Sequence, residues 1–204
     1  SLLEDDLKET ASPSMREYFP LIAAECGKME ELATRIGWLF DPPRNGEAER
    51  MHILLTALAS DIHREFPRAQ LAVEVDPGIR DAYVAHGSGL LIALKEVARN
   101  AAESGGRDSR ISIDCRPGKK DSACIRISDS GRGMAAGEED KVFDPFFTTK
   151  SKHVGIGLCI ARRIIGDCRG SITVGPGGPP GVMVCVTVPL AGADGVVRSE
   201  KGGQ

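Results

Sequence analysis

The sequence lacks the patterns that mark zinc, membrane or nucleic-acid proteins. Its six cysteines form no C-x-x-C pair and have no histidines grouped beside them, which argues against a zinc site. Most of the cysteines fall in apolar segments, so we expect buried, reduced thiols. No apolar run approaches the roughly 20 residues that a membrane-spanning helix needs. The formal net charge of −3 gives no electrostatic reason to expect binding to nucleic acid or to a membrane surface.

A secretory signal peptide and an initiating methionine are also missing. The chain of 204 residues begins at Ser1. We therefore expect a cytoplasmic piece of a longer protein, with any membrane anchor or sensory part upstream. Its composition, 41% apolar and 27% charged residues, is ordinary for a globular protein. This length favours one domain with an appendage, or two small domains.

Residues 1–40 are typical of a helical hairpin. A short leucine-containing segment precedes a turn predicted at residues 10–14, which contain Pro13. From residue 15 to residue 40, apolar residues recur at steps of three and four, which predicts one long amphipathic helix. Such a helix must bury its apolar stripe against a partner. The segment before the turn is too short, so we expect that partner upstream or on a second chain.

A linker is predicted at residues 41–46, because Pro42 and Pro43 disfavour helix in the residues before them. The domain that follows is predicted over residues 47–190, and residues 191–204 are expected to form a disordered, glycine-rich tail. Periodicity within the domain predicts helices and strands in alternation. The helices are expected at 47–65, 90–103 and 157–168, and the strands at 70–75, near Tyr83, and at 110–115, 123–128, 171–174 and 182–188. This order predicts an α+β protein, a two-layer sandwich whose mixed, mostly antiparallel sheet has helices on one face.

One stretch, residues 129–158, carries most of the candidate chemistry. It opens with Asp129, Gly131 and Gly133, and it closes with Gly155 and Gly157 at the start of a predicted helix. Glycine allows close backbone approach and positive φ. A glycine-rich turn that opens a helix suits a polyphosphate, because free N–H groups and the helix dipole point at the anion. We therefore interpret the stretch as a nucleotide-binding lid.

Further polar residues have a plain and a functional interpretation. Glu96 and Asn100 are four residues apart on one helix face, where a solvated pair is the plain alternative. In the functional interpretation, the Asn100 oxygen binds Mg²⁺ and Glu96 accepts or orients a proton. Asp129 is either a turn residue or a carboxylate that accepts the amino hydrogen of adenine. Thr149 and Lys150 could donate to phosphate oxygens.

Three phenylalanines lie inside the same stretch, at positions 143, 146 and 147. Phenylalanine is most often a core residue, and here we expect all three to anchor the mobile, charged segment around them. None of the four histidines lies in a nucleophile or metal pattern.

These pieces, in this order, resemble the ATP-binding domain of bacterial sensor histidine kinases, which belongs to the wider group of gyrase, Hsp90 and MutL. KEVARNAAE (95–103) is similar to the N box of that family and DSGRGM (129–134) to its G1 box. VFDPFFTTK (142–150) is similar to the F box, closest to the nitrogen-regulation type, and VGIGLCIARRII (154–165) to the G2 box. The closing GSITV and PGVMVCVTVPL segments resemble the last two strands of the family.

The resemblance, which covers about residues 47–190, implies a Bergerat-type ATP-binding fold that holds ATP and Mg²⁺. It places Asn100 on the metal and Asp129 on adenine, and Glu96 becomes the candidate catalytic residue. The other implied ATP-binding residues are Gly131, Gly133, Thr149, Lys150, Gly155, Gly157 and Leu158. The sequence departs from the family at His153, where a glycine is usual, and at Val182, where Thr or Ser is frequent.

Residues 1–40 resemble the end of the dimerisation hairpin of these kinases, without the H box that carries the phosphorylated histidine. We therefore expect the phosphoacceptor histidine outside this chain. The implied partners are that histidine hairpin, the receiver domain of a response regulator, and a second copy bound through residues 1–40; nucleic acid is not among them. Two alternatives remain: a nucleotide-gated ATPase switch of the gyrase or Hsp90 kind, and a pseudokinase that only binds partners.

Overall fold

The structure is a computed structural model that describes residues 13–43, 47–150, 153–178 and 180–197. The chain divides into two compact units, residues 1–40 and residues 41–204. In the first unit, helix α2 (Pro13–Phe40) covers the predicted helix. It begins inside the turn predicted at residues 10–14, because proline is tolerated in the first turn of a helix; residues 10–12 lie outside the described part.

Apolar side chains of α2 are exposed to solvent. Leu21, Ile22 and Met29 keep 62%, 57% and 71% of their accessible surface. These residues belong to the stripe that the sequence predicts must be covered. No helix in the described part of the chain is long and apolar enough to cross a membrane.

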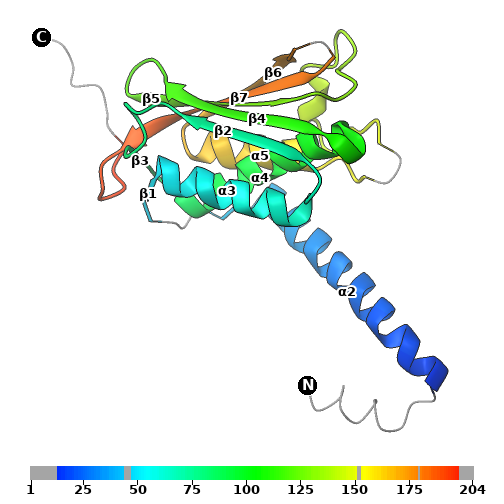
Figure 1. The fold of residues 1–204 in the computed structure, drawn as a ribbon. Helices are drawn as coiled ribbons and strands as arrows, with labels where there is room; N and C mark the ends of the chain where they lie inside the picture. Colours follow the sequence, from blue (N-terminus) through cyan, green and yellow to red (C-terminus); the bar gives the residue numbers. More distant parts are fainter. Residues whose placement is uncertain (1–12, 44–46, 151–152, 179, 198–204) are drawn as a thin grey trace, which may run out of the picture. The chain divides into compact units, whose positions relative to one another are not determined.

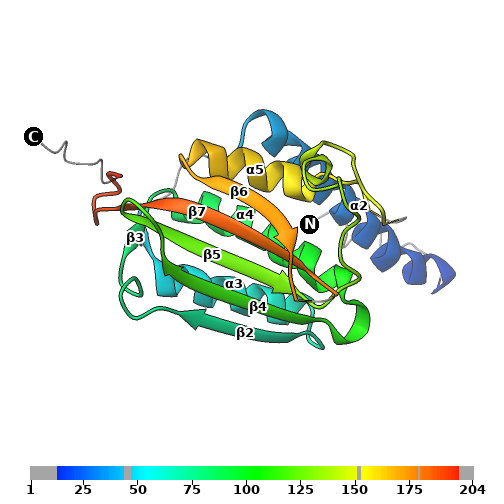
Figure 2. The ribbon, with the colours of Figure 1, turned by 90° about the horizontal axis from the view of Figure 1, so that it is seen from above.

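The second unit has a mixed sheet covered on one face by helices, as Figures 1 and 2 show. Its elements run β1 (Glu49–Arg50), α3 (Met51–Glu65), β2 (Gln70–Val75), β3 (Tyr83–Val84), α4 (Gly87–Ser104), the 3₁₀ turn Gly106–Asp108, β4 (Arg110–Pro117), β5 (Ser122–Asp129), the 3₁₀ turn Lys141–Phe143, α5 (Gly157–Asp167), β6 (Ser171–Pro176) and β7 (Val182–Ala191). The strand order is β1-β3-β7-β5-β4-β2, and β6 also pairs with β7. Among the strand pairs of the described residues, β2–β4 is parallel and the others are antiparallel. The predicted α+β sandwich is therefore confirmed.

Alternation along the strands separates a buried face from an open one. In β4, Ile111, Ile113 and Cys115 are buried towards the helices, whereas Ser112 and Asp114 lie on the other face. The core is completed by apolar residues of α3, α4 and α5, among them Leu54, Leu58, Leu90, Leu94, Ile160 and Ile164. Side chains at every second strand position meet helix positions three and four apart, as expected for a two-layer fold.

Three predictions about local structure need correction. The helix predicted at 47–65 starts only at Met51, because Glu49 and Arg50 pair with β3. The tail predicted from residue 191 is ordered at first: Ala191 ends β7 and pairs with Val197, while residues 198–204 lie outside the described part. The six cysteines are free as expected, but only Cys115 and Cys168 are buried, and Cys26 is exposed. Burial raises the pKa of Cys115 to about 12 and that of Cys168 to about 11.

Candidate functional site

Residues from α4 and from the segment before α5 meet at Lys150. The Lys150 ammonium lies 2.8 Å from the side-chain oxygen of Asn100 and 3.2 Å from its backbone oxygen. It also forms an ion pair with Glu103, at 3.1 Å between Nζ and Oε2. The imidazole of His153 lies 3.5 Å from the same Glu103 oxygen. Two residues predicted for the same site, 50 positions apart in sequence, are thus in direct contact.

Asp129 ends β5 with its carboxylate on the buried, helix-covered side of the sheet. Its Oδ1 accepts a hydrogen bond of 2.7 Å from the amide of Gly131. Burial raises the pKa of the Asp129 carboxyl, while hydrogen bonds from the amides of Gly131 and Val182 and the charge of Lys150 act in the opposite direction. A carboxylate has about four lone-pair positions, so it retains capacity to accept from a ligand.

The glycines around Asp129 are packed so closely that no side chain fits. A Cβ at Gly131 would lie 2.7 Å from Cβ of Ser104 and 2.8 Å from Oδ1 of Asp129. A Cβ at Gly181 would lie only 2.1 Å from the carbonyl oxygen of Asp129. Gly133 has φ +78, a conformation that other residues rarely adopt. The end of β5, the start of β7 and the end of α4 are therefore packed closely together around the buried Asp129 carboxylate, and we call this close-packed group the Asp129 cradle.

The second pair of predicted glycines lies at the start of α5. Gly155 has φ +74, and a Cβ there would lie 2.6 Å from the carbonyl oxygen of Phe147. Gly157 is the first residue of α5, and Leu158 beside it is half-buried. The first amides of a helix have no partner within it and carry the positive end of the helix dipole. This end of α5 can therefore receive an anion.

The three phenylalanines do not share one role. Phe143 is buried, and the Arg162 guanidinium of α5 lies 5.3 Å from its ring centroid. Phe147 is half-buried. Phe146 is 65% exposed and has φ 68, with its amide bonded to the Gly155 carbonyl at 2.8 Å. The prediction that all three anchor this segment is wrong for Phe146, because its unusual backbone conformation directs the ring to solvent.

The remaining predicted residues have structural contacts. Glu96 is buried on α4 and lies 3.7 Å from Arg99, which is in turn ion-paired with Glu65 of α3 at 2.8 Å. This network ties α4 to α3. The Thr149 hydroxyl accepts a hydrogen bond from Arg132. Thr149 therefore contacts the glycine-rich segment after β5 through a side chain.

Three residues of the site were not predicted from the sequence. Glu103 holds Lys150, Ser104 lies against Gly131 and bonds the Asn100 carbonyl at 2.8 Å, and Gly181 closes the cradle. Glu103 and Ser104 lie three and four positions after Asn100, on the same helical face, so that spacing was an available signal. Nothing local distinguishes Gly181 from the other glycines of its turn, because its role depends on strand pairing.

Known proteins with similar sequences share a family profile with this chain. The profile of a family described as "Histidine kinase-, DNA gyrase B-, and HSP90-like ATPase" matches residues 85–192. The sensor histidine kinase ZraS of Salmonella typhimurium is 36% identical over 75 residues, which are 37% of this chain and 16% of that protein. The chain spans only 16% to 28% of the length of the curated relatives ZraS and AtoS.

Two solved structures share the fold. A mycobacterial sensor histidine kinase, MprB, has a TM-score of 0.64 at 24% identity and covers 72% of this chain and 98% of its own. The histidine kinase ThkA, solved in complex with the response regulator protein TrrA, has a TM-score of 0.66 at 20% identity; the match covers 92% of this chain and 55% of that one.

Proposed function

Because the chain belongs to the family of histidine kinase-, DNA gyrase B- and HSP90-like ATPases, we propose that it is the ATP-binding catalytic core of a two-component sensor histidine kinase. The observation that carries the proposal is the buried carboxylate of Asp129 beside the cradle of Gly131 and Gly181, where a side chain would clash with its surroundings. The TTK sequence at residues 148–150 favours the nitrogen-regulation type of kinase.

Adenine would be read by Asp129. An ionised carboxylate only accepts hydrogen bonds, so it suits the amino group of adenine and disfavours a base that presents an oxygen there. Gly131 and Gly133 would leave room for the ring. Because the carboxylate is buried, an interaction with the base is stronger than it would be at the surface.

The phosphates would lie towards α5, with Gly155, Gly157 and Leu158 supplying backbone amides and Thr149 and Lys150 supplying side-chain donors. Mg²⁺ would be held by the side-chain oxygen of Asn100 together with phosphate oxygens and water, in keeping with its preference for oxygen ligands. In the described part of the chain no group of acidic, cysteine or histidine side chains could hold a metal by itself. When bound, the metal would neutralise phosphate charge.

Lys150 and a metal would compete for the same Asn100 oxygen. In the structure that oxygen lies 2.8 Å from the Lys150 ammonium. A cation bound at Asn100 would repel the ammonium, so Lys150 would turn towards the phosphates as Mg–ATP enters. Its ion pair with Glu103 would then be lost or rearranged.

Glu96 is the residue we propose for a catalytic part, as a group that accepts or orients a proton. It is buried one helical turn before Asn100, so its carboxylate lies on the same face of α4. In a kinase the proton would come from the attacking histidine, and in an ATPase from water.

The partners we propose are a histidine-bearing hairpin outside this chain and a response regulator receiver domain. ThkA was solved with such a regulator. A second copy of the chain would pack on the apolar stripe of α2, whose Leu21, Ile22 and Met29 are exposed. We place this core in the cytoplasm, where ATP is available.

The test is phosphoryl transfer to a hairpin supplied as a separate chain. We expect radiolabel from the terminal phosphate of ATP to appear on the hairpin in an acid-labile form, as a phosphohistidine. A hairpin with its histidine changed to alanine is the matched control and should remain unlabelled. Release of free phosphate without labelling of the hairpin would overturn the kinase proposal.

A nucleotide-gated ATPase switch is the second candidate, and buried Glu96 favours it because hydrolysis needs a base for water. The Glu96→Gln variant distinguishes the two functions. If the protein is an ATPase, this variant should no longer release phosphate. If it is a kinase, the variant should produce less labelled hairpin. A pseudokinase would form neither product.

A further inference from the structure

The open face of the sheet has a hollow beside the end of β5. Three short side chains, Ala72, Ser112 and Ser128, lie in one row across β2, β4 and β5, as the strand register places them directly opposite one another. Longer residues occupy the neighbouring rows: Gln70 and Arg110 on one side, Asp114 and Arg126 on the other. A row of short side chains between rows of long ones leaves a cavity, and here its volume is about 500 Å³.

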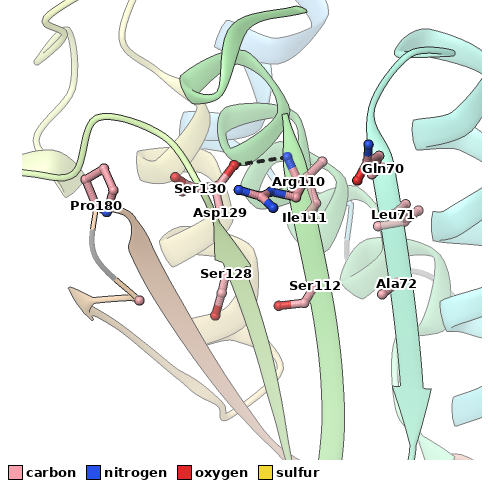
Figure 3. A pocket seen from close by; sticks show the side chains of 11 residues that line it. Gln70, Leu71, Ala72, Arg110, Ile111, Ser112, Ser128, Asp129, Ser130 and Pro180 are labelled. Atoms are coloured by element: carbon pink, nitrogen blue, oxygen red, sulfur yellow. Dashed lines mark hydrogen bonds between the residues drawn. The ribbon is translucent and has the colours of Figure 1, made fainter. Parts of the chain in front are cut away.

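Figure 3 shows Arg110 between Ser130 and Gln70, with Ser128 and Ser112 further along their strands and Pro180 at the left. The cavity adjoins the proposed nucleotide site, because Asp129 and Ser130 at the end of β5 also belong to its lining. Side chains alternate along a strand, so Ser128 faces the cavity while the Asp129 carboxylate faces the helices.

The electrostatic character of the cavity comes from Arg110. In the described part of the chain its guanidinium has no carboxylate partner and no hydrogen-bond acceptor. Its backbone is fixed, because its amide donates to Ser130 Oγ at 3.1 Å and its carbonyl accepts from the Ser130 amide at 3.1 Å. The Arg110 side chain therefore extends from a fixed backbone position at the edge of the hollow.

The other charged side chains on this face of the sheet are largely in ion pairs. Asp114 lies 2.9 Å from Arg116 and 3.0 Å from Arg126, so one carboxylate is shared by two guanidinium groups. Glu74 is exposed on β2 beside Asp114. Counting Arg110, Arg116 and Arg126 against Asp114 and Glu74 leaves one positive charge.

We propose that this cavity binds a small hydroxylated organic anion through the Arg110 guanidinium and the Ser112 and Ser128 hydroxyls. Arginine presents parallel N–H donors that match carboxylate and phosphate oxygens. The serine hydroxyls, which have no hydrogen-bond partner within the described residues, can donate to or accept from the hydroxyls of the ligand. A cavity of this size falls within the range of about 300–1,000 Å³ typical of small-molecule sites. Carboxylate and phosphate share this chemistry, and the test separates them.

The test is amide NMR titration of the isotope-labelled chain, without nucleotide, using glycerophosphate, glycerate and neutral glycerol as probes. We expect saturable shifts of the amides of Ala72, Ser112 and Ser128 with an anionic probe and none with glycerol. The anion that binds more tightly identifies the group that the site prefers. Shifts centred on Asn100 and Gly131 instead would overturn the proposal, as would the absence of saturation with both anions at millimolar concentration.

Variants locate the binding. Arg110→Gln should weaken binding by about tenfold or more, the effect of losing one charge-assisted hydrogen-bonded contact. Ser112→Leu should abolish binding, because the larger side chain fills the hollow. Arg116→Gln is the matched control, since it removes an arginine from the same strand and face but not from the cavity lining. Affinity that falls equally in Arg116→Gln and Arg110→Gln would show a general charge effect and overturn the assignment.

Discussion

At the scale of single residues, the Lys150 ammonium contacts both Glu103 and Asn100, the residue that we propose as a ligand of Mg²⁺. The Lys150 and Glu103 side chains are each about one-fifth exposed, so their ion pair is partly screened by solvent. A pair of this kind contributes a modest free energy to holding Lys150 on the oxygen that we propose for the metal.

We therefore expect Glu103→Gln to strengthen Mg–ATP binding by about two- to fivefold, because Lys150 is released more easily. Isothermal titration calorimetry with and without Mg²⁺ measures the effect, which should be larger with the metal. Glu25→Gln, which breaks an exposed pair with Lys28 on α2, is the control and should leave affinity unchanged. Weaker binding by Glu103→Gln would contradict the competition between Lys150 and the metal.

The pH dependence of stability gives a second test at this scale. Burial raises the pKa of the Asp129 carboxyl above its ordinary value of 3.8, so folding disfavours the ionised form. The cost is absent below the unfolded-state pKa and develops as pH rises through the folded-state pKa. In urea denaturation, the free energy of unfolding of Asp129→Asn relative to wild type should rise over this window and then become constant. A relative stability that falls with rising pH would show that hydrogen bonds outweigh burial.

At the scale of elements, the start of α5 depends on the conformation of Gly155. Its φ of +74 and the 2.6 Å separation from the Phe147 oxygen leave no place for a methyl group. We expect Gly155→Ala to reduce stability by about 1–2 kcal/mol or more and to weaken ATP binding. Gly166→Ala, within α5 itself, is the control, because nothing lies within 4 Å of its added Cβ; it should stabilise the protein by up to about 1 kcal/mol. Thermal unfolding and nucleotide titration of both variants distinguish these outcomes.

Phe143 and Phe146 form a second matched pair. Phe143 is buried beneath Arg162, whereas Phe146 is 65% exposed. Phe143→Ala should lower the unfolding free energy by about 3–5 kcal/mol, the usual cost of truncating a buried phenylalanine. Phe146→Ala removes little buried surface and should cost less than about 1 kcal/mol. Chemical denaturation of both variants tests this, and equal losses would contradict the assignment of Phe143 as the anchor.

Local patterns predicted the long elements well. The helical spacing around Glu96 and Asn100 lies within α4, and the alternation at residues 110–115 and 123–128 lies within β4 and β5. What they missed depends on distant partners. Glu49 and Arg50 form a strand only because β3 pairs with them, and Gly181 closes the cradle only because β7 brings it to Asp129. The exposed ring of Phe146 follows from a backbone conformation that its residue type disfavours.

The open-face cavity was equally inaccessible to sequence patterns. Ala72, Ser112 and Ser128 are ordinary small residues in three separate strands, and only the register aligns them in one row. Likewise, the contact between Lys150 and Asn100 joins residues 50 positions apart. The family resemblance named both residues but not their contact.

At the scale of the whole molecule, the nucleotide site belongs to one of the two compact units. Every residue assigned to it, from Glu96 to Gly181, lies in the unit of residues 41–204. The other unit supplies the exposed apolar stripe of α2, which we assign to association with a second helix. The nucleotide site and the helix association that we propose therefore belong to different units of the chain.

The central claim is that this chain binds ATP through the Asp129 cradle, and calorimetric titration of Mg–ATP tests it most directly. We predict one nucleotide bound per chain, with affinity lowered at least tenfold in Asp129→Ala. Affinity should be unchanged in Arg116→Gln, on the opposite face of the sheet. Absence of ATP binding by the wild-type chain, or equal affinity of Asp129→Ala and wild type, would contradict the account.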